Sequence, residues 1–148
     1  MDRILIEKLT PEMLSDVAEL ESAVFAEPWS ENALILLLEG NNVGFAALSE
    51  SGRLLGYGGM VTVLDEGQIT NIAVNPDCRR QKIGERIVLS LIEYGEKNGI
   101  SSFSLEVRES NAAAIALYEK LGFEMVGVRK SFYSKPTENA IVMIKNIG

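Results

Sequence analysis

The segment from residue 67 to residue 98 constrains the fold of this chain more than any other. Residues 67–74 are rich in apolar side chains and are typical of a strand. Four apolar side chains then recur at the spacing of one helix face: Ile83, Ile87, Leu91 and Tyr94. Gly99 ends this helix, and an irregular loop containing Arg79 and Arg80 joins it to the strand. The segment therefore predicts a strand–loop–helix unit within a sheet-containing domain.

Further strands and helices are predicted on both sides of this unit. Strands are expected at residues 3–8, 42–49, 53–64, 102–108, 123–130 and 138–145, and helices after Thr10, over 31–38 and after Asn111. Thr10, Ser30 and Asn111 are residue types that cap helix N-termini. The order β-α-α-β-β-β-α-β-α-β-β predicts an α/β or α+β fold with a mixed sheet. The 148 residues, 47% of them hydrophobic, fit one domain over residues 1–148.

Composition excludes several kinds of chemistry. The chain has one cysteine, Cys78, and no histidine, so neither an internal disulfide nor a zinc site built from these residues is expected. Acid–base chemistry therefore falls to Glu, Asp, Tyr, Lys or Cys. The net charge of −7 argues against a nucleic-acid partner. It would suit a cationic partner, and it is also an ordinary means of keeping a protein soluble.

The sequence shows no signal peptide and no membrane-spanning segment. The longest apolar run, Ala33 to Leu38, is far shorter than the roughly 20 residues that cross a bilayer. We therefore expect a soluble cytoplasmic protein that does not bind membranes. Nothing in the sequence favours a particular oligomeric state.

Three features could carry chemistry, and each also has a purely structural explanation. Backbone amides at the start of the helix near Gly84 could hold a phosphate, or the basic loop could be a solvated connection. Glu106 lies on the polar stripe of its strand, where a carboxylate can be a base or simply face solvent. Tyr118 lies on an apolar helix face, which is usual for a core residue. Cys78 shows no sign of activation, and Trp29 is expected to pack as a hydrophobic anchor.

Three runs of sequence combine these features into one pattern. They are Ile69-Thr-Asn-Ile-Ala-Val-Asn-Pro76, Leu105-Glu-Val-Arg-Glu-Ser-Asn111 and Ala112-Ala-Ala-Ile-Ala-Leu-Tyr-Glu-Lys-Leu-Gly-Phe123. In these runs the chain resembles the GNAT family of acetyl-CoA-dependent N-acetyltransferases, and within it the RimI branch, which acetylates protein N-termini. Pro28-Trp29-Ser30, Tyr133 and Glu138-Asn-Ala140 agree with that branch. The resemblance implies the GNAT fold, a mixed and mostly antiparallel central sheet with splayed central strands, flanked by helices.

The resemblance also implies roles for individual residues. The pantetheine arm of acetyl-CoA would pair with the strand at Ile72, Ala73 and Val74, whose last amide could polarise the thioester carbonyl. The pyrophosphate would be bound around Arg79, Arg80, Gln81, Lys82, Ile83, Gly84 and Glu85. Asn111 matches a CoA-contacting asparagine, Glu106 the general base and Tyr118 the general acid. The expected acceptor is a basic protein N-terminus, in this branch the N-terminal alanine of ribosomal protein S18, bound near Pro28-Trp29 and Tyr133.

Two residues depart from the family pattern. Lys82 occupies a glycine position, where its side chain could hinder a phosphate or contact it. Glu85 places a negative charge beside the expected pyrophosphate. Two alternatives therefore stand beside acetylation of a protein N-terminus. One is a GNAT enzyme acting on a small-molecule amine or on lysine, and the other is a CoA-binding module without catalysis.

Overall fold

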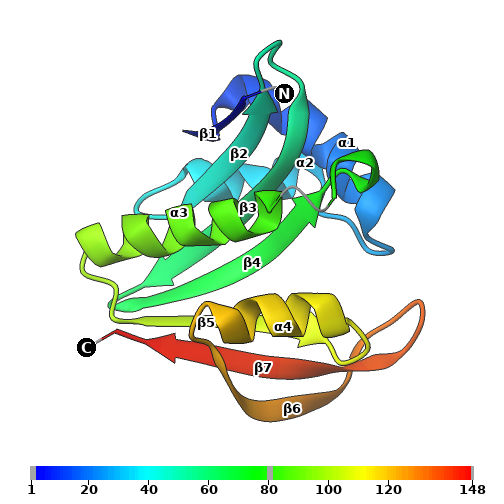
Figure 1. The fold of residues 1–148 in the computed structure, drawn as a ribbon, viewed down its shortest axis with the longest axis vertical. Helices are drawn as coiled ribbons and strands as arrows, with labels where there is room; N and C mark the ends of the chain where they lie inside the picture. Colours follow the sequence, from blue (N-terminus) through cyan, green and yellow to red (C-terminus); the bar gives the residue numbers. More distant parts are fainter. Residues whose placement is uncertain (1–2, 80–81, 148) are drawn as a thin grey trace.

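The seven strands of the protein form one sheet (Figure 1). The computed structural model describes residues 3–79 and 82–147. The strands are β1 (Ile4–Lys8), β2 (Val43–Ser49), β3 (Leu54–Val63), β4 (Glu66–Val74), β5 (Ser102–Arg108), β6 (Glu124–Tyr133) and β7 (Glu138–Asn146). Their order in the sheet is β1-β2-β3-β4-β5-β7-β6, and β4 and β5 are the parallel pair among antiparallel neighbours. The predicted mixed, mostly antiparallel sheet is confirmed.

The helices begin and end close to the predicted positions. They are α1 (Leu14–Val24), α2 (Glu31–Leu34), α3 (Ile83–Lys97) and α4 (Ala112–Lys120), with 3-10 turns at Pro11–Met13, Ile35–Leu38 and Pro76–Cys78. The single helix expected over 31–38 is instead a short α-helix followed by a 3-10 turn. Ser30 caps α2 by accepting a hydrogen bond from the Ala33 amide at 3.1 Å, whereas the Thr10 side chain makes no capping bond.

The helices cover both faces of the sheet (Figure 1). On one face α3 and α4 pack over a core that includes Ile87, Leu91 and Phe103. On the other face α1 and the segment after it cover a second core, which includes Val17 and Leu34. None of the helices in the described part of the chain has the length and apolar character needed to cross a membrane.

The two parallel strands separate part of the way along their length. β4 and β5 are paired from Glu66 to Gln68, opposite Ser102 to Ser104, and not beyond. β4 nevertheless continues to Val74 and β5 to Arg108, while each remains paired to its other neighbour. The carboxyl-terminal half of β4 therefore presents an unpaired edge to a gap in the middle of the sheet, as the predicted splayed strands require.

Candidate active site

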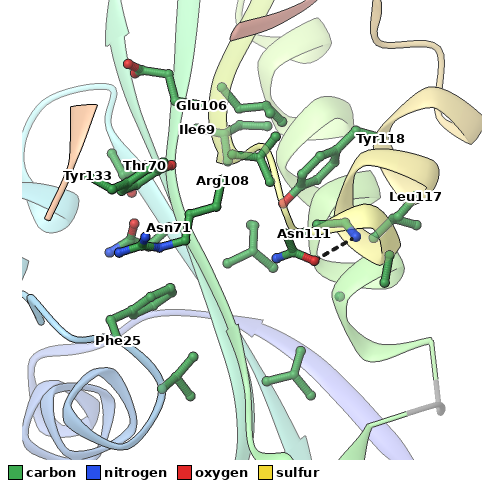
Figure 2. Close-up of a pocket in the computed structure, with 18 of the residues that line it drawn as sticks. Phe25, Ile69, Thr70, Asn71, Glu106, Arg108, Asn111, Leu117, Tyr118 and Tyr133 are labelled. Atoms are coloured by element: carbon green, nitrogen blue, oxygen red, sulfur yellow. Dashed lines mark hydrogen bonds between the residues drawn. The ribbon is translucent and has the colours of Figure 1, made fainter. Parts of the chain in front are cut away.

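A cleft of about 1270 Å³ opens where β4 and β5 separate. Both strands line it, together with the start of α3, one side of α4, the loop after α1 and the turn between β6 and β7. Figure 2 shows that the side chains reach it from both faces of the sheet, with Tyr118 and Glu106 on opposite sides of β5. Two substrates could therefore meet in the gap from opposite directions.

The N-terminus of α3 forms one end of the cleft. Amides in the first turn of a helix have no partner within the helix and carry the positive end of its dipole, which favours phosphate. A Cβ built on Gly84 would lie no closer than 3.8 Å to the side chains of Ile72 and Val74. The fold itself therefore does not require glycine here, and the open space suits close approach of a ligand. Arg80 and Gln81, also predicted to bind pyrophosphate, lie outside the described residues.

Lys82 and Glu85, the two departures from the family pattern, are both accommodated. Lys82 is the N-cap residue of α3 and adopts the left-handed conformation, with φ 58° and ψ 26°. This conformation favours glycine, so the backbone adopts the shape expected for the family's glycine, and the Cβ of Lys82 makes that shape strained. Lys120 Nζ lies 2.6 Å from Glu85 Oε1, and this bond holds the pKa of Glu85 below its ordinary value. Lys120 of α4 thus offsets the negative charge of Glu85 at the start of α3.

The free edge of β4 offers main-chain donors to the gap. Asn75 donates its amide to Leu55 O at 2.8 Å, toward β3. Because successive amides of a strand point in opposite directions, the amides of Val74 and Ile72 face the gap and that of Ala73 faces β3. Of the three residues predicted to pair with pantetheine, Ile72 and Val74 are therefore the ones that can donate to an added chain.

Asn111 caps α4 as expected and also lines the cleft. Its Oδ1 accepts a hydrogen bond from the Ala114 amide at 3.1 Å and so caps α4. Because only the oxygen can accept this bond, the Nδ2 end of the amide is free to turn toward the cleft, as Figure 2 shows. The cap therefore fixes a hydrogen-bond donor where α4 meets the cleft.

Tyr118 is held as a neutral phenol beside the gap. It is a buried residue of α4 that packs edge-to-face on Phe123, with 5.9 Å between ring centroids. Burial, with a smaller contribution from Tyr133, raises the pKa of Tyr118 to about 12. In Figure 2 its hydroxyl points into the cleft above Asn111. Tyr118 is therefore both a core residue and a group that can donate a proton there.

Glu106 lies on the opposite face of β5 from Tyr118. Its neighbours Leu105 and Val107 point into the core under the helices, and strand alternation turns Glu106 the other way. Its side chain is only 14% exposed, so the carboxylate does not simply face solvent. Gln68 Nε2 donates to Oε1 at 3.3 Å, and Arg129 Nε lies 3.2 Å from Oε2. That contact is an ion pair without hydrogen-bond geometry, so Oε2 is a buried oxygen that accepts no hydrogen bond from the described residues.

Tyr133 and a small ionic network border the cleft next to Glu106. Burial first, and then the charge of Glu106, raises the pKa of Tyr133 above its ordinary value. The Arg108 guanidinium lies 4.5 Å from the centre of the Tyr133 ring and 3.1 Å from Glu138 Oε1. Arg108 also donates to the carbonyl oxygens of Ser134 and Pro136, at 3.0 Å each. These bonds fix the turn between β6 and β7 where it meets the cleft.

Of the predicted site residues that the structure describes, all but Ala73 line this one cleft. The backbone of Ala73 faces β3 instead. Two contributing residues were not predicted: Lys120 and Arg129. Lys120 could have been anticipated as a C-terminal cation of the helix after Asn111, but its pairing with α3 depends on tertiary packing. Arg129 reaches Glu106 through strand register that includes two irregularities in β6, which no sequence pattern indicates.

Comparisons with known proteins agree with this geometry. The model of the acetyltransferase (GNAT) family matches residues 14–123. The chain is 41% identical over 128 residues to the ribosomal protein bS18-alanine N-acetyltransferase of Escherichia coli (strain K12), an alignment that covers 84% of each chain. A Bacillus subtilis (strain 168) protein, provisionally named as the same kind of enzyme, is 37% identical over 133 residues, which cover 89% of this chain and 88% of that protein.

A solved structure agrees over nearly the whole length. The crystal structure of the ribosomal-protein-S18-alanine N-acetyltransferase from Escherichia coli matches with a TM-score of 0.90 at 36% identity, covering 99% of this chain and 95% of that chain. The family model, the sequence relatives and this structure agree with one another and with the resemblance seen in the sequence. The chain belongs to the acetyltransferase (GNAT) family, in its RimI branch.

Proposed function

We propose that the protein transfers an acetyl group from acetyl-CoA to the N-terminal alanine of ribosomal protein bS18. The observation that carries the proposal is the gap between β4 and β5, with Tyr118 on one face of the sheet and Glu106 on the other. The substrate is inferred from relatives that are 37–41% identical and carry this activity in their names. A ribosomal acceptor would place the reaction in the cytoplasm.

The residues present fit acetyl-CoA, which when bound would supply the acetyl group as an activated thioester. The α3 N-terminus, with Gly84 and Lys82, would hold the pyrophosphate. The edge amides of Ile72 and Val74 would bind the pantetheine arm as an added strand. Val74 could at the same time donate to the thioester oxygen and stabilise the charge that develops there. The chemistry requires no metal.

Glu106 is proposed to accept the proton of the acceptor amine. An α-ammonium group has a pKa of about 7.7–8, so its deprotonation near pH 7 costs only about 1 kcal/mol. A partly buried carboxylate with a free accepting position suffices for that task, directly or through a water molecule. Tyr118, which keeps its proton up to a pKa of about 12, is proposed to protonate the departing thiolate.

The acceptor side of the cleft suits a cationic peptide. Glu27, Glu106 and Glu138 line it from three different elements. Glu138 is partly neutralised by Arg108, whereas Glu27 accepts a hydrogen bond from Ser134 Oγ across the mouth of the cleft. An ammonium group would therefore meet three carboxylates at this end, two of them already paired with arginines, and Lys135 lines the same cleft.

A panel of acceptors tests the proposal. Thiol release from acetyl-CoA is measured with a peptide of the bS18 N-terminal sequence, its N-terminally blocked form, a lysine-containing blocked peptide and a small primary amine. The proposal expects the free alanine peptide to be acetylated at least 100-fold more efficiently than the others, as judged by kcat/KM. Preference for the lysine peptide or the small amine would assign another acceptor class. Millimolar acetyl-CoA binding without turnover would indicate a non-catalytic CoA-binding module.

A further inference from the structure

Glu21 is a charged side chain buried entirely beside the acceptor end of the cleft. It lies in α1 with 0% of its surface exposed, which sets it apart from the other charged side chains in the described part of the chain. Burial of a carboxylate is costly unless hydrogen-bond donors surround it. Glu21 has three such donors, and they come from three different parts of the fold.

Two of the three donors lie in the walls of the cleft where the acceptor peptide would bind, and the third lies in the core. Glu21 Oε1 accepts from the Trp29 amide at 2.9 Å, in the loop that follows α1. Oε2 accepts from Asn71 Nδ2 at 2.9 Å, on the free part of β4, and also from the Tyr57 hydroxyl on β3. Trp29 and Asn71 line the cleft, whereas Tyr57 is completely buried. Burial, and then the charge of Glu21, raises the pKa of Tyr57, so this hydroxyl stays a donor.

The bonds to Glu21 determine how Asn71 and the loop face the cleft. A carboxylate accepts hydrogen bonds and donates none, so the Asn71 side chain must turn its NH₂ group, and not its oxygen, toward Glu21. The bond from the Trp29 amide holds an irregular segment, residues 25–30, against β4. Phe25, Glu27 and Trp29 of this segment line the cleft, as does Asn71 itself. Glu21 is thus connected to two walls of the acceptor side without reaching the cleft.

We propose that Glu21 is a positioning residue that sets the geometry of the acceptor site through Asn71 and the loop 25–30. The proposal rests on the proposed function for its kinetic consequences. The hydrogen bonds of Glu21 in the described structure go neither to α3 nor to the main chain of β4. Loss of Glu21 should therefore affect binding of the acceptor peptide and leave binding of acetyl-CoA unchanged.

Glu21→Gln is the direct test, because it keeps the size of the side chain. It replaces one accepting oxygen with an NH₂ group, which must then face the Trp29 amide or Asn71 Nδ2, both of which are donors. Asn71 could avoid the conflict by flipping, which would reverse the polarity that it shows to the cleft. The expected result is a rise of about ten-fold in KM for the alanine peptide, with KM for acetyl-CoA within two-fold of the wild type.

Two further variants separate positioning from stability. Tyr57→Phe removes a buried hydrogen bond to the same carboxylate but leaves its bonds to Trp29 and Asn71, so it should lower Tm while KM for the peptide stays within two-fold. Asn71→Ala should raise KM for the peptide about as much as Glu21→Gln. In the double variant of Glu21 and Asn71, KM for the peptide should then stay within two-fold of its value in either single variant. KM values that follow Tm across the set, or multiplicative effects in the double variant, would overturn the proposal.

Trp29 supplies a readout that does not depend on activity. It is the single tryptophan of the chain, so intrinsic fluorescence reports on the loop that Glu21 holds. Glu21→Gln should shift the emission to longer wavelength and increase quenching by acrylamide in the folded protein, and Tyr57→Phe should not. If the wild type acetylates no N-terminal peptide, the proposed function fails. An unchanged Trp29 signal in folded Glu21→Gln would instead refute the positioning role.

Discussion

Replacing Lys82 with glycine should stabilise the protein and at the same time weaken its binding of CoA. Lys82 adopts φ 58° and ψ 26°, a left-handed conformation that costs a residue with a Cβ roughly 1–2 kcal/mol. Glycine avoids this strain but loses about 0.5–1 kcal/mol more backbone entropy on folding. Removing a cation from the positive end of the α3 dipole adds about 0.3–1 kcal/mol of stability. The net gain is about 1 kcal/mol, or roughly 3 °C in Tm for a chain of this size.

The effect on CoA binding is expected to have the opposite sign. Lys82 already follows the glycine path, so the first-turn amides of α3 are in place, and its exposed side chain lines the cleft rather than filling it. An exposed ion pair contributes about 0.2–1 kcal/mol, so loss of the ammonium should raise the Kd of CoA by about 1.4- to 5-fold. Because the contribution is screened, the difference should shrink in 0.5 M salt.

Thermal unfolding and calorimetric titration with CoA at low and high salt measure both effects. Lys82→Arg is the matched control, because it keeps the charge and the strain and should leave Tm and Kd close to the wild-type values. Lys82→Asn should give most of the stability gain, since asparagine tolerates the left-handed region. A lower Tm in Lys82→Gly would refute the strain argument. Tighter CoA binding, independent of salt, would show that the side chain obstructs the phosphate site.

Four further outcomes follow from the site. Glu106→Gln should lose rate mainly below pH 8, where the acceptor amine is protonated, and a wild-type rate across pH 6–9 would exclude Glu106 as the base. Tyr118→Phe should lower kcat about 100-fold without abolishing activity, because a thiol with a pKa near 8.5 is already a fair leaving group. The raised pKa of Tyr118, about 12 against 10.0, favours the folded state by roughly 3 kcal/mol below pH 10. This contribution is lost as the pH rises from 10 to 12, and chemical denaturation across that range should show a smaller loss in Tyr118→Phe. Lys120→Met should raise the Kd of CoA by leaving Glu85 unpaired at the phosphate end, and Lys120→Arg should preserve it.

The fold could be predicted because local pattern and tertiary structure agree along most of the chain. The alternation in β5 and the helical spacing in α3 survive unchanged, since each element buries the face that its sequence marks. The residues after Ser30 are the exception. Their apolar run suggests one helix, yet it divides into a short α-helix and a 3-10 turn before Gly40, whose φ of 56° reverses the chain.

The candidate site could be predicted only where a residue type carries its role in a local motif. Asn111 caps a helix and faces the cleft from the same position, so one sequence signal served both interpretations. Glu21 has no such signal, because an acidic residue in an amphipathic helix is usually solvated. Its burial follows from donors that lie eight, 36 and 50 residues away along the chain. Arg129 is similar, because strand register alone brings it to Glu106.

The division of the cleft between the two faces of the sheet makes the roles of its residues separable. Tyr118, Asn111 and the start of α3 belong to the face covered by α3 and α4, whereas Glu106 and Tyr133 approach from the other face (Figures 1 and 2). A cofactor on the first face and an amine on the second can meet only through the gap between β4 and β5. Direct transfer in a ternary complex follows from this arrangement more readily than an acetylated enzyme, since Cys78 is a buried thiol whose pKa burial raises. Steady-state kinetics should therefore show intersecting rather than parallel lines when both substrates are varied.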